Sequence, residues 1–218
     1  RLSLVGSEMC IRDSYIKSTD VVKDAASYYI IQNVGSILEN EDQRGLAHFL
    51  EHMAFNGTEH FPGKGILNTL QKHGAVFGKD INAYTGFDET VYNLDNIPTK
   101  EGLIDTCLTV LKDWSNYLLL TDEEIDAERG VIKEEWRTRQ NGQMRLFQSS
   151  LPITYNHSTY ANRLPIGLMS VVESFDYKAL RDFYHDWYRT NLQAIAIIGD
   201  ININDIEQNI IEKFSKIP

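Results

Sequence analysis

The residues with the clearest chemistry are His48, Glu51 and His52, which form an H-x-x-E-H sequence. Residues four apart on a helix share one face and lie about 6 Å apart along its axis, so both imidazoles can reach one metal ion. Glu51 falls on the same flank, where a carboxylate can take a proton from water. We therefore expect a helix over 46–55 whose apolar side anchors it and whose polar side does chemistry. The apolar side consists of Leu46, Phe49, Leu50 and Met53.

A chance cluster on a solvated face and a structural zinc site are the alternatives to a catalytic centre. Six histidines in 218 residues make the full motif rare by chance. Structural zinc sites are usually closed by four ligands and rich in cysteine, but Cys10 and Cys107 stand in no ligand spacing. A carboxylate beside the histidines suits an open site better, so we favour a metal-dependent hydrolytic centre.

A third protein ligand is expected on a second helix, over 121–139. One face of this helix carries Ile125, Glu128, Ile132, Glu135 and Trp136, which places two carboxylates in an apolar stripe. Carboxylates are rarely buried without a metal or a cation. Glu128 and Glu135 are about 10 Å apart along the axis, so one is expected to bind the ion and the other to support it. The alternative is a charged helix edge, or an ion pair with Arg129, Arg139 or a distant lysine.

Helices and strands alternate along the rest of the chain and must position these residues. Asn56-Gly57 is typical of a helix end, and Thr121 with Glu124 forms a capping box. Trp114, Trp136 and Trp187 are interpreted as core packing. The expected helices are 46–55, 65–73, 99–117, 121–139, 176–188 and 205–214, and the expected extended segments are 28–34, two stretches within 82–93 around Gly86, and 194–199.

The composition excludes some classes of function. The net charge of -10 argues against nucleic acid as a partner. No apolar run reaches the roughly 18 to 20 residues of a transmembrane segment, so none is expected in this fragment. Residues 1–14 lack clean periodicity and resemble a translated sequencing adaptor. We expect this segment to be artefactual or disordered and the domain to comprise residues 15–218.

Seven runs of the sequence, in this order, resemble the pitrilysin or insulinase family of zinc peptidases, which includes the mitochondrial processing peptidases. They cover nearly everything after about Tyr28. The resemblance implies an α+β fold (an α/β sandwich), with a mixed, mainly antiparallel sheet and helices packed on it, in a single pitrilysin-type metallopeptidase domain. The runs are 44–58 (RGLAHFLEHMAFNGT), 82–85 (NAYT), 89–92 (ETVY), 128–132 (ERGVI), 163–167 (RLPIG), 183–188 (FYHDWY) and 199–200 (GD).

The resemblance also implies roles for residues. His48 and His52 would bind one Zn²⁺ per chain, and Glu51 would act as general base in a zinc-dependent metalloendopeptidase. The family's local motif makes Glu135 the third ligand and Glu128 its support, although the residue count from His52 fits Glu128 better, so Glu128 stays the alternative ligand. The implied substrate-binding edge strand is Asn82, Ala83, Tyr84 and Thr85.

The expected substrates are peptides or small unfolded proteins. By the same resemblance, a second homologous domain or subunit would close a chamber over the site. We therefore expect this chain to be the first half of a longer protein, weak or inactive alone, from the bacterial periplasm or cell envelope. The alternatives are a non-catalytic zinc-binding subunit and a scaffold that binds peptides along the strand edge without cutting them.

Overall fold

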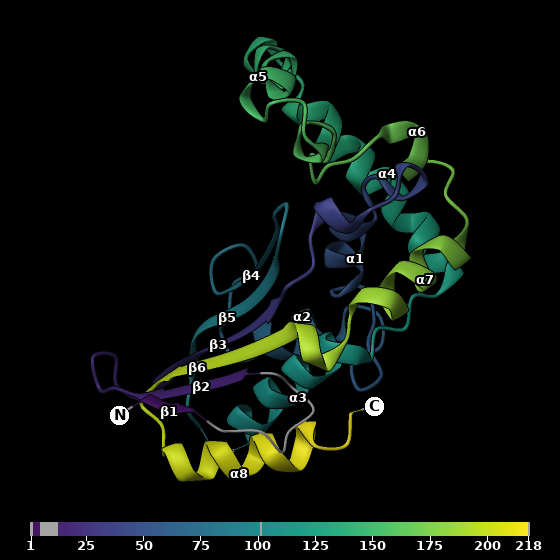
Figure 1. Ribbon diagram of the computed structural model, residues 1–218. Coiled ribbons are helices and arrows are strands. Elements are labelled where there is room, and N and C mark those ends of the chain that lie inside the picture. Colours follow the sequence, from purple (N-terminus) through teal and green to yellow (C-terminus); the bar gives the residue numbers. More distant parts are fainter. Residues whose placement is uncertain (1, 5–12, 101, 218) are drawn as a thin grey trace.

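The strands form one mixed sheet in the computed structural model, which describes residues 2–4, 13–100 and 102–217, with side chains for 13–100 and 102–217. Within these residues the sheet has six strands in the order β1-β2-β6-β3-β5-β4 (Figure 1). Strands β2 and β6 run parallel, and all other neighbours run antiparallel. The predicted α+β fold with a mainly antiparallel sheet is confirmed. The strands are β1 (Leu2–Leu4), β2 (Asp13–Ser18), β3 (Ala25–Gln32), β4 (Ile81–Thr85), β5 (Thr90–Pro98) and β6 (Gln193–Gly199).

Helices α3 and α8 pack on one side of the sheet, whereas α1, α4 and α7 form a second group beside its β4 end (Figure 1). Helix α5 projects furthest from the sheet. The helices are α1 (Leu46–Met53), α2 (Gly65–Gln71), α3 (Leu103–Asn116), α4 (Asp122–Arg139), α5 (Gly142–Thr154), α6 (Met169–Val172), α7 (Tyr177–Trp187) and α8 (Ile203–Phe214), and short 3₁₀ turns span Ser36–Leu38, Glu41–Gln43, Thr159–Asn162 and Thr190–Leu192.

The core lies between the sheet and α3, and it holds the end of α1. Trp114 of α3 is fully buried, as predicted, and stacks on Tyr92 of β5 with ring centroids 5.2 Å apart. Its indole Nε1 donates a hydrogen bond of 3.0 Å to the carbonyl of Ala54, just after α1. A buried Trp N–H needs such a partner. The C-terminal end of α1 is therefore tied directly to the core.

Two glycines set the entry of α1. Gly45 precedes the helix with φ at 113°, a left-handed conformation that glycine adopts without steric cost. Gly167, with φ at 70°, lies against it: a Cβ added at Gly167 would come 2.3 Å from the Cα of Gly45 and 2.5 Å from the carbonyl oxygen of Arg44. Since no side chain fits at this separation, the main chains pack directly and fix where α1 begins.

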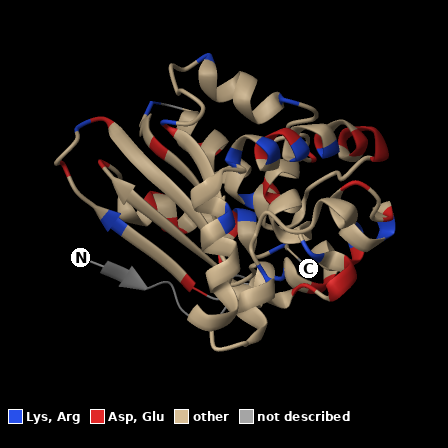
Figure 2. Cartoon of the chain, turned by 90° about the horizontal axis from the view of Figure 1, so that it is seen from above, with Lys and Arg blue, Asp and Glu red and all other residues tan. Residues whose placement is uncertain are grey.

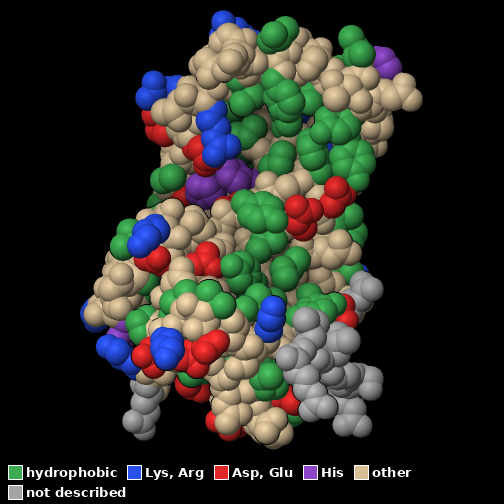
Figure 3. All heavy atoms as spheres, turned by 90° about the vertical axis from the view of Figure 1, so that its left-hand side faces the viewer, with side chains coloured by type: hydrophobic (Ala, Val, Ile, Leu, Met, Phe, Trp, Pro, Cys, Tyr) green, Lys and Arg blue, Asp and Glu red, His purple; other side chains and the backbone are tan. Residues whose placement is uncertain are grey.

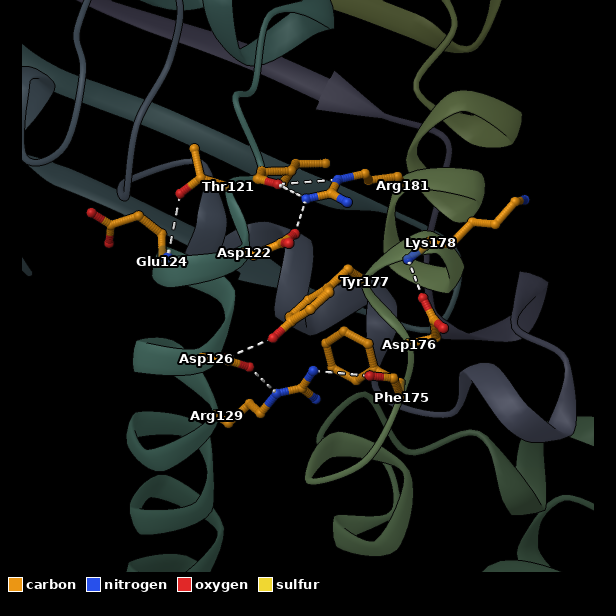
Figure 4. A network of polar contacts seen from close by, with 11 residues as sticks. Thr121, Asp122, Glu124, Asp126, Arg129, Phe175, Asp176, Tyr177, Lys178 and Arg181 are labelled. Atoms are coloured by element: carbon orange, nitrogen blue, oxygen red, sulfur yellow. Dashed lines mark hydrogen bonds and ion pairs between the residues drawn. The ribbon is translucent and has the colours of Figure 1, made fainter.

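Arg129 fastens α4 to the segment between α6 and α7 (Figure 4). Its two Nη atoms donate to the carbonyls of Val172 and Phe175 at 2.8 and 2.9 Å, and its guanidinium lies 4.0 Å from the ring centroid of Phe175. The carboxylate of Asp126 accepts from Arg129 Nε at 3.1 Å and from Tyr177 Oη at 2.6 Å. These contacts join α4 to the end of α6 and the start of α7.

Some predicted boundaries differ in the structure. The helix predicted from residue 99 begins at Leu103, because Gly102, with φ at 80°, and not Thr99, forms the helix start. Helix α5 is absent from the sequence-based expectations. Residues 2–4 and 13–14, expected to be artefactual or disordered, lie in β1 and β2, while 1 and 5–12 fall outside the described residues. The domain boundary at residue 15 therefore stays a prediction.

Figure 2 shows on which elements the charged residues lie. Acidic and basic residues both occur along the helices there, and the strands carry few charges. Among the described residues, no helix combines the length and apolar character needed to cross a bilayer.

Candidate metal centre and active site

Helix α1 carries the H-x-x-E-H residues toward a cavity and its apolar residues toward the core. Leu46, Phe49, Leu50 and Met53 are all buried, as the helical spacing predicts. At the start of the helix, the carboxyl group of Glu39 accepts a hydrogen bond of 2.9 Å from the main-chain N–H of Ala47. This satisfies one of the free N–H groups of the first turn. The helix is thus held at its start, along its apolar face and at its end.

Two imidazoles from α1 and one carboxylate from α4 converge at the same point. Nε2 of His52 lies 3.2 Å from Oε2 of Glu135, and Nε2 of His48 lies 3.6 Å from the same oxygen. The ligand-type atoms of these three residues all lie within 4.8 Å of one another, a group that could hold a metal ion. Histidine nitrogen and carboxylate oxygen are the donors typical of catalytic zinc sites.

Glu128 lies on the other side of His52, away from this point. Its Oε1 is 2.7 Å from Nδ1 of His52, and its Oε2 accepts a hydrogen bond of 2.5 Å from Nδ2 of Asn56. Glu128 is 7% exposed, so its charge is satisfied by these partners and not by water. The two glutamates on this helix face therefore have different positions. Glu135 faces Nε2 of both imidazoles, whereas Glu128 contacts only Nδ1 of His52.

Of the ion pairs considered as an alternative to metal binding by Glu128 and Glu135, the one between Glu135 and Arg139 is present. Nη2 of Arg139 lies 2.5 Å from Oε1 of Glu135, and Arg139 lines the same cavity as the histidines. Arg129 binds Asp126 and main-chain carbonyls and does not pair with Glu128. Glu135 thus presents one oxygen to Arg139 and the other to the imidazoles.

The electrostatics of the group follow from burial and these contacts. Burial, together with the charge of His52, lowers the pKa of His48 to about 4, so its imidazole is neutral at pH 7. Burial also acts to lower the pKa of His52, but the hydrogen bonds to Glu128 and Glu135 outweigh it and raise that pKa to about 9. The hydrogen bond from His52 lowers the pKa of Glu135. Glu135 is therefore ionised and can present its carboxylate to a cation.

Glu51 lies beside the converging atoms and is held by strand β4. Oγ1 of Thr85 donates a hydrogen bond of 2.6 Å to Oε2 of Glu51. Burial raises the pKa of Glu51, and the hydrogen bond from Thr85 opposes that rise. The side chain has one bonded oxygen and lines a cavity with the other site residues, as a proton acceptor requires.

Strand β4 contains the predicted substrate-binding residues and lies at the edge of the sheet. It pairs with β5 on one side, and no other strand in the described part of the chain pairs with its free side. Ala83, Tyr84 and Thr85 line the cavity that holds the three-residue group, and Asn82 lines an adjoining cavity. The free main-chain groups of an edge strand can bind an extended peptide whatever its sequence.

Two cavities of about 290 Å³ each meet at Glu51, His52 and Ala83. In Figure 3 the histidines show at the middle of one face, with hydrophobic side chains gathered above them. The apolar wall of the first cavity comes from Trp136, Met144, Phe147, Leu164, Pro165 and Ile166. The walls of the second come from Phe55, Leu67, Phe77 and Val131, with Asn56 and Lys64.

Several residues of the two cavities are not predicted from the sequence as site residues. Trp136, which its sequence context assigns to core packing, is half-buried in the structure and lines the first cavity. Its position one residue after Glu135 was the available signal. Asn56 is predicted only as a helix end, and no sequence signal points to Lys64.

The combined site can hold a cation, a base and an extended chain side by side.

Comparison with known proteins identifies the class. Residues 16–165 match the insulinase family (Peptidase family M16), and residues 174–218 match the inactive domain of the same peptidases. The chain therefore belongs to the insulinase family, and the resemblance found in its sequence is confirmed.

Particular relatives are named as zinc proteases. Probable zinc protease PqqL of Escherichia coli (strain K12) is 37% identical over 196 residues, which cover 90% of this chain and 21% of that protein. PqqL of Haemophilus influenzae is 37% identical over 191 residues, covering 88% and 20%. The solved first half of the periplasmic protease PqqL from Escherichia coli has a TM-score of 0.92 at 35% identity and covers 99% of this chain and 46% of that one. The chain spans about a fifth of the length of these curated relatives.

Proposed function

We propose that this chain is the catalytic part of a zinc-dependent metalloendopeptidase that hydrolyses peptides or small unfolded proteins. The observation that carries the proposal is the convergence of His48, His52 and Glu135, whose ligand-type atoms lie within 4.8 Å of one another beside the carboxylate of Glu51. The names of the relatives support zinc as the metal.

The donor set fits one zinc ion per chain. His48 and His52 would supply Nε2, Glu135 would supply Oε2, and Glu128 would hold His52 from behind. Three protein ligands and a neighbouring free carboxylate are typical of a catalytic site, whereas a structural site has four ligands. When bound there, zinc supplies an electrophile that acidifies a water molecule and polarises the peptide carbonyl.

The residues of the chain perform the remaining steps. The carboxylate of Glu51 takes the proton of the attacking water and later gives it to the leaving amine. Thr85 holds Oε2 of Glu51, which keeps the carboxylate in place beside the histidines. The main chain of residues 82–85 pairs with an extended substrate and sets its scissile bond over the site.

A second homologous domain is proposed to close the chamber, and the periplasm is the proposed compartment. Support comes from the solved relative, which is described as the first half of a periplasmic protease, and from the length of the curated relatives. On this proposal, adding such a domain to the chain raises peptidase activity.

The test compares the parent chain with Glu51→Gln, using the exposed Glu123→Gln on α4 as control. Bound zinc is measured by elemental analysis, and cleavage of a peptide library is followed by mass spectrometry. Glu51→Gln is expected to keep its zinc and lose about 100-fold or more of the cleavage rate, while Glu123→Gln matches the parent. Cleavage by Glu51→Gln at the parent rate would contradict the proposal. Stoichiometric zinc without cleavage of any peptide, even with the second domain present, would favour a non-catalytic zinc-binding subunit.

A further inference from the structure

A line of polar contacts runs from the surface to the back of His52. Nζ of Lys64 donates to Oδ1 of Asn56, Nδ2 of Asn56 donates to Oε2 of Glu128 at 2.5 Å, and Oε1 of Glu128 lies 2.7 Å from Nδ1 of His52. Asn56 is 4% exposed. Its partners are therefore protein groups, and both atoms of its amide are used.

The position of Asn56 is set by the end of α1. Its main-chain N–H donates to the carbonyl of Met53 at 3.0 Å, so its backbone continues the turn that closes the helix bearing His52. Lys64, at the start of α2, returns to the same place eight residues later. The three side chains and the histidine are thus anchored on α1, α2 and α4.

The two neighbours of Asn56 fix which way its amide faces. The carboxylate of Glu128 can only accept and the ammonium of Lys64 can only donate, so the NH₂ group faces Glu128 and the carbonyl faces Lys64. An aspartate would place a second carboxylate against Glu128, and a leucine would leave a buried oxygen of Glu128 unpaired. Asparagine meets both requirements within this space.

We propose that Asn56 is a positioning residue of the metal centre, which orients the Glu128 carboxylate so that His52 keeps a proton on Nδ1 and its Nε2 lone pair is available to the ion that Glu135 would share. This proposal rests on the proposed zinc site and adds Asn56, the residue that contacts Glu128, to the groups that support it. Groups that hold a ligating histidine from behind typically change metal affinity by about 10- to 100-fold when lost.

The test uses a reciprocal exchange. Asn56→Leu is expected to raise the zinc Kd about 10- to 100-fold in competition with a chelator, and Asn56→Asp at least as much. The double variant Asn56→Asp with Glu128→Gln exchanges the amide and the carboxylate between the two positions. The amide now at position 128 donates to the carboxylate at position 56, and its carbonyl accepts from Nδ1 of His52. The double variant is expected to bind zinc more tightly than Asn56→Asp alone. The control is the exposed Asn68→Ala on α2, which keeps the parent Kd.

A second readout does not need zinc or catalysis. The ¹⁵N chemical shifts of the His52 ring in the metal-free protein, recorded at a pH high enough for the ring to be neutral, report which nitrogen carries the remaining proton, and Asn56→Leu is expected to increase the Nε2–H form. Thermal unfolding of each variant shows that it is folded. An unchanged Kd with unchanged ring shifts in Asn56→Leu would overturn the proposal, as would a double variant that binds zinc no better than Asn56→Asp. Because neither readout uses peptide cleavage, a protein that cleaves no peptide even with the second domain present would defeat the proposed function and leave this inference standing.

Discussion

Thr85, on the edge strand, donates a hydrogen bond of 2.6 Å from Oγ1 to Oε2 of Glu51 on helix α1. The bond joins the strand proposed to bind substrate to the proposed general base. Misplacement of a substrate on the strand would therefore change its position relative to the base.

Thr85→Val removes this donor while nearly keeping the side-chain shape. A hydrogen bond to a charged group is worth about 1.5–3 kcal/mol, so kcat/KM is expected to fall about 10- to 100-fold. Because the Thr85 bond opposes the rise that burial causes in the pKa of Glu51, its loss raises that pKa further. The acid limb of the pH–rate profile should move to higher pH. Thr85→Ser, which keeps the hydroxyl, should retain the parent profile, and identical profiles for the two variants would argue against this role.

Substitution of the two glutamates on α4 distinguishes ligand from support. Glu128→Gln keeps a group that can accept from His52 and is expected to weaken zinc binding by about 10- to 100-fold. Glu135→Gln removes a charged ligand from the proposed site and is expected to weaken it more. Both constants come from chelator competition. The reverse order would make Glu128 the third ligand.

Glu39 provides a pH-dependent contribution to stability. Burial raises its pKa from 4.5 to about 8, against the opposing hydrogen bonds from main-chain N–H groups. Between these values the folded chain holds a proton that the unfolded chain has lost. The stabilisation is therefore complete below pH 4.5 and declines as the pH rises to 8, by at most about 1.4 kcal/mol per pH unit.

The measurement is the free energy of unfolding in urea from about pH 5 to 8, the range set by the two pKa values of Glu39. The parent is expected to lose stability over this range, and Glu39→Gln, which keeps no titrating proton, should show a flatter profile. Glu123→Gln, an exposed substitution on α4, is the control and should follow the parent. Parallel profiles for the parent and Glu39→Gln would refute the buried-proton argument.

Arg129 gives a prediction about the packing of α4 (Figure 4). Lysine cannot reach two carbonyls and stack on Phe175 at once, so Arg129→Lys is expected to cost about 2 kcal/mol and lower Tm. Arg137→Lys, at an exposed ion pair on the same helix, should change stability by less than about 0.5 kcal/mol. Equal effects of the two substitutions would contradict this account.

Local signals made the site helices predictable. The spacing of His48, Glu51 and His52 predicts one polar face, and the side chain of Thr121 accepts a hydrogen bond from the N–H of Glu124 at the start of α4, as the cap pattern indicates. These features depend on neighbours within one or two turns. The mixed sheet was expected from the resemblance to the peptidase family. The parallel pairing of β2 with β6 joins residues far apart in the sequence, such as Asp13 and Ala194, and no local sequence pattern predicts it.

The choice between Glu128 and Glu135 could not follow from periodicity. Seven residues make almost two full turns, so both side chains leave α4 on the same face. Only the placement of α4 against α1 brings Glu135 to both imidazoles and Glu128 behind His52. The role of Asn56 beside Glu128 could not be predicted for a similar reason. Its position at the end of a helix is a local feature, whereas its contact with Glu128 spans 72 residues of sequence.

The contact between Gly45 and Gly167 bears on how this protein can be redesigned. A methyl group at Gly167 would collide with the Gly45 main chain, and the displaced turn leads within three residues to His48. The loop around Gly167 therefore cannot be exchanged as freely as an ordinary surface connection. Any loop grafted there must retain a glycine at this point, or the imidazoles will turn away from Glu135 although no group near them has been altered.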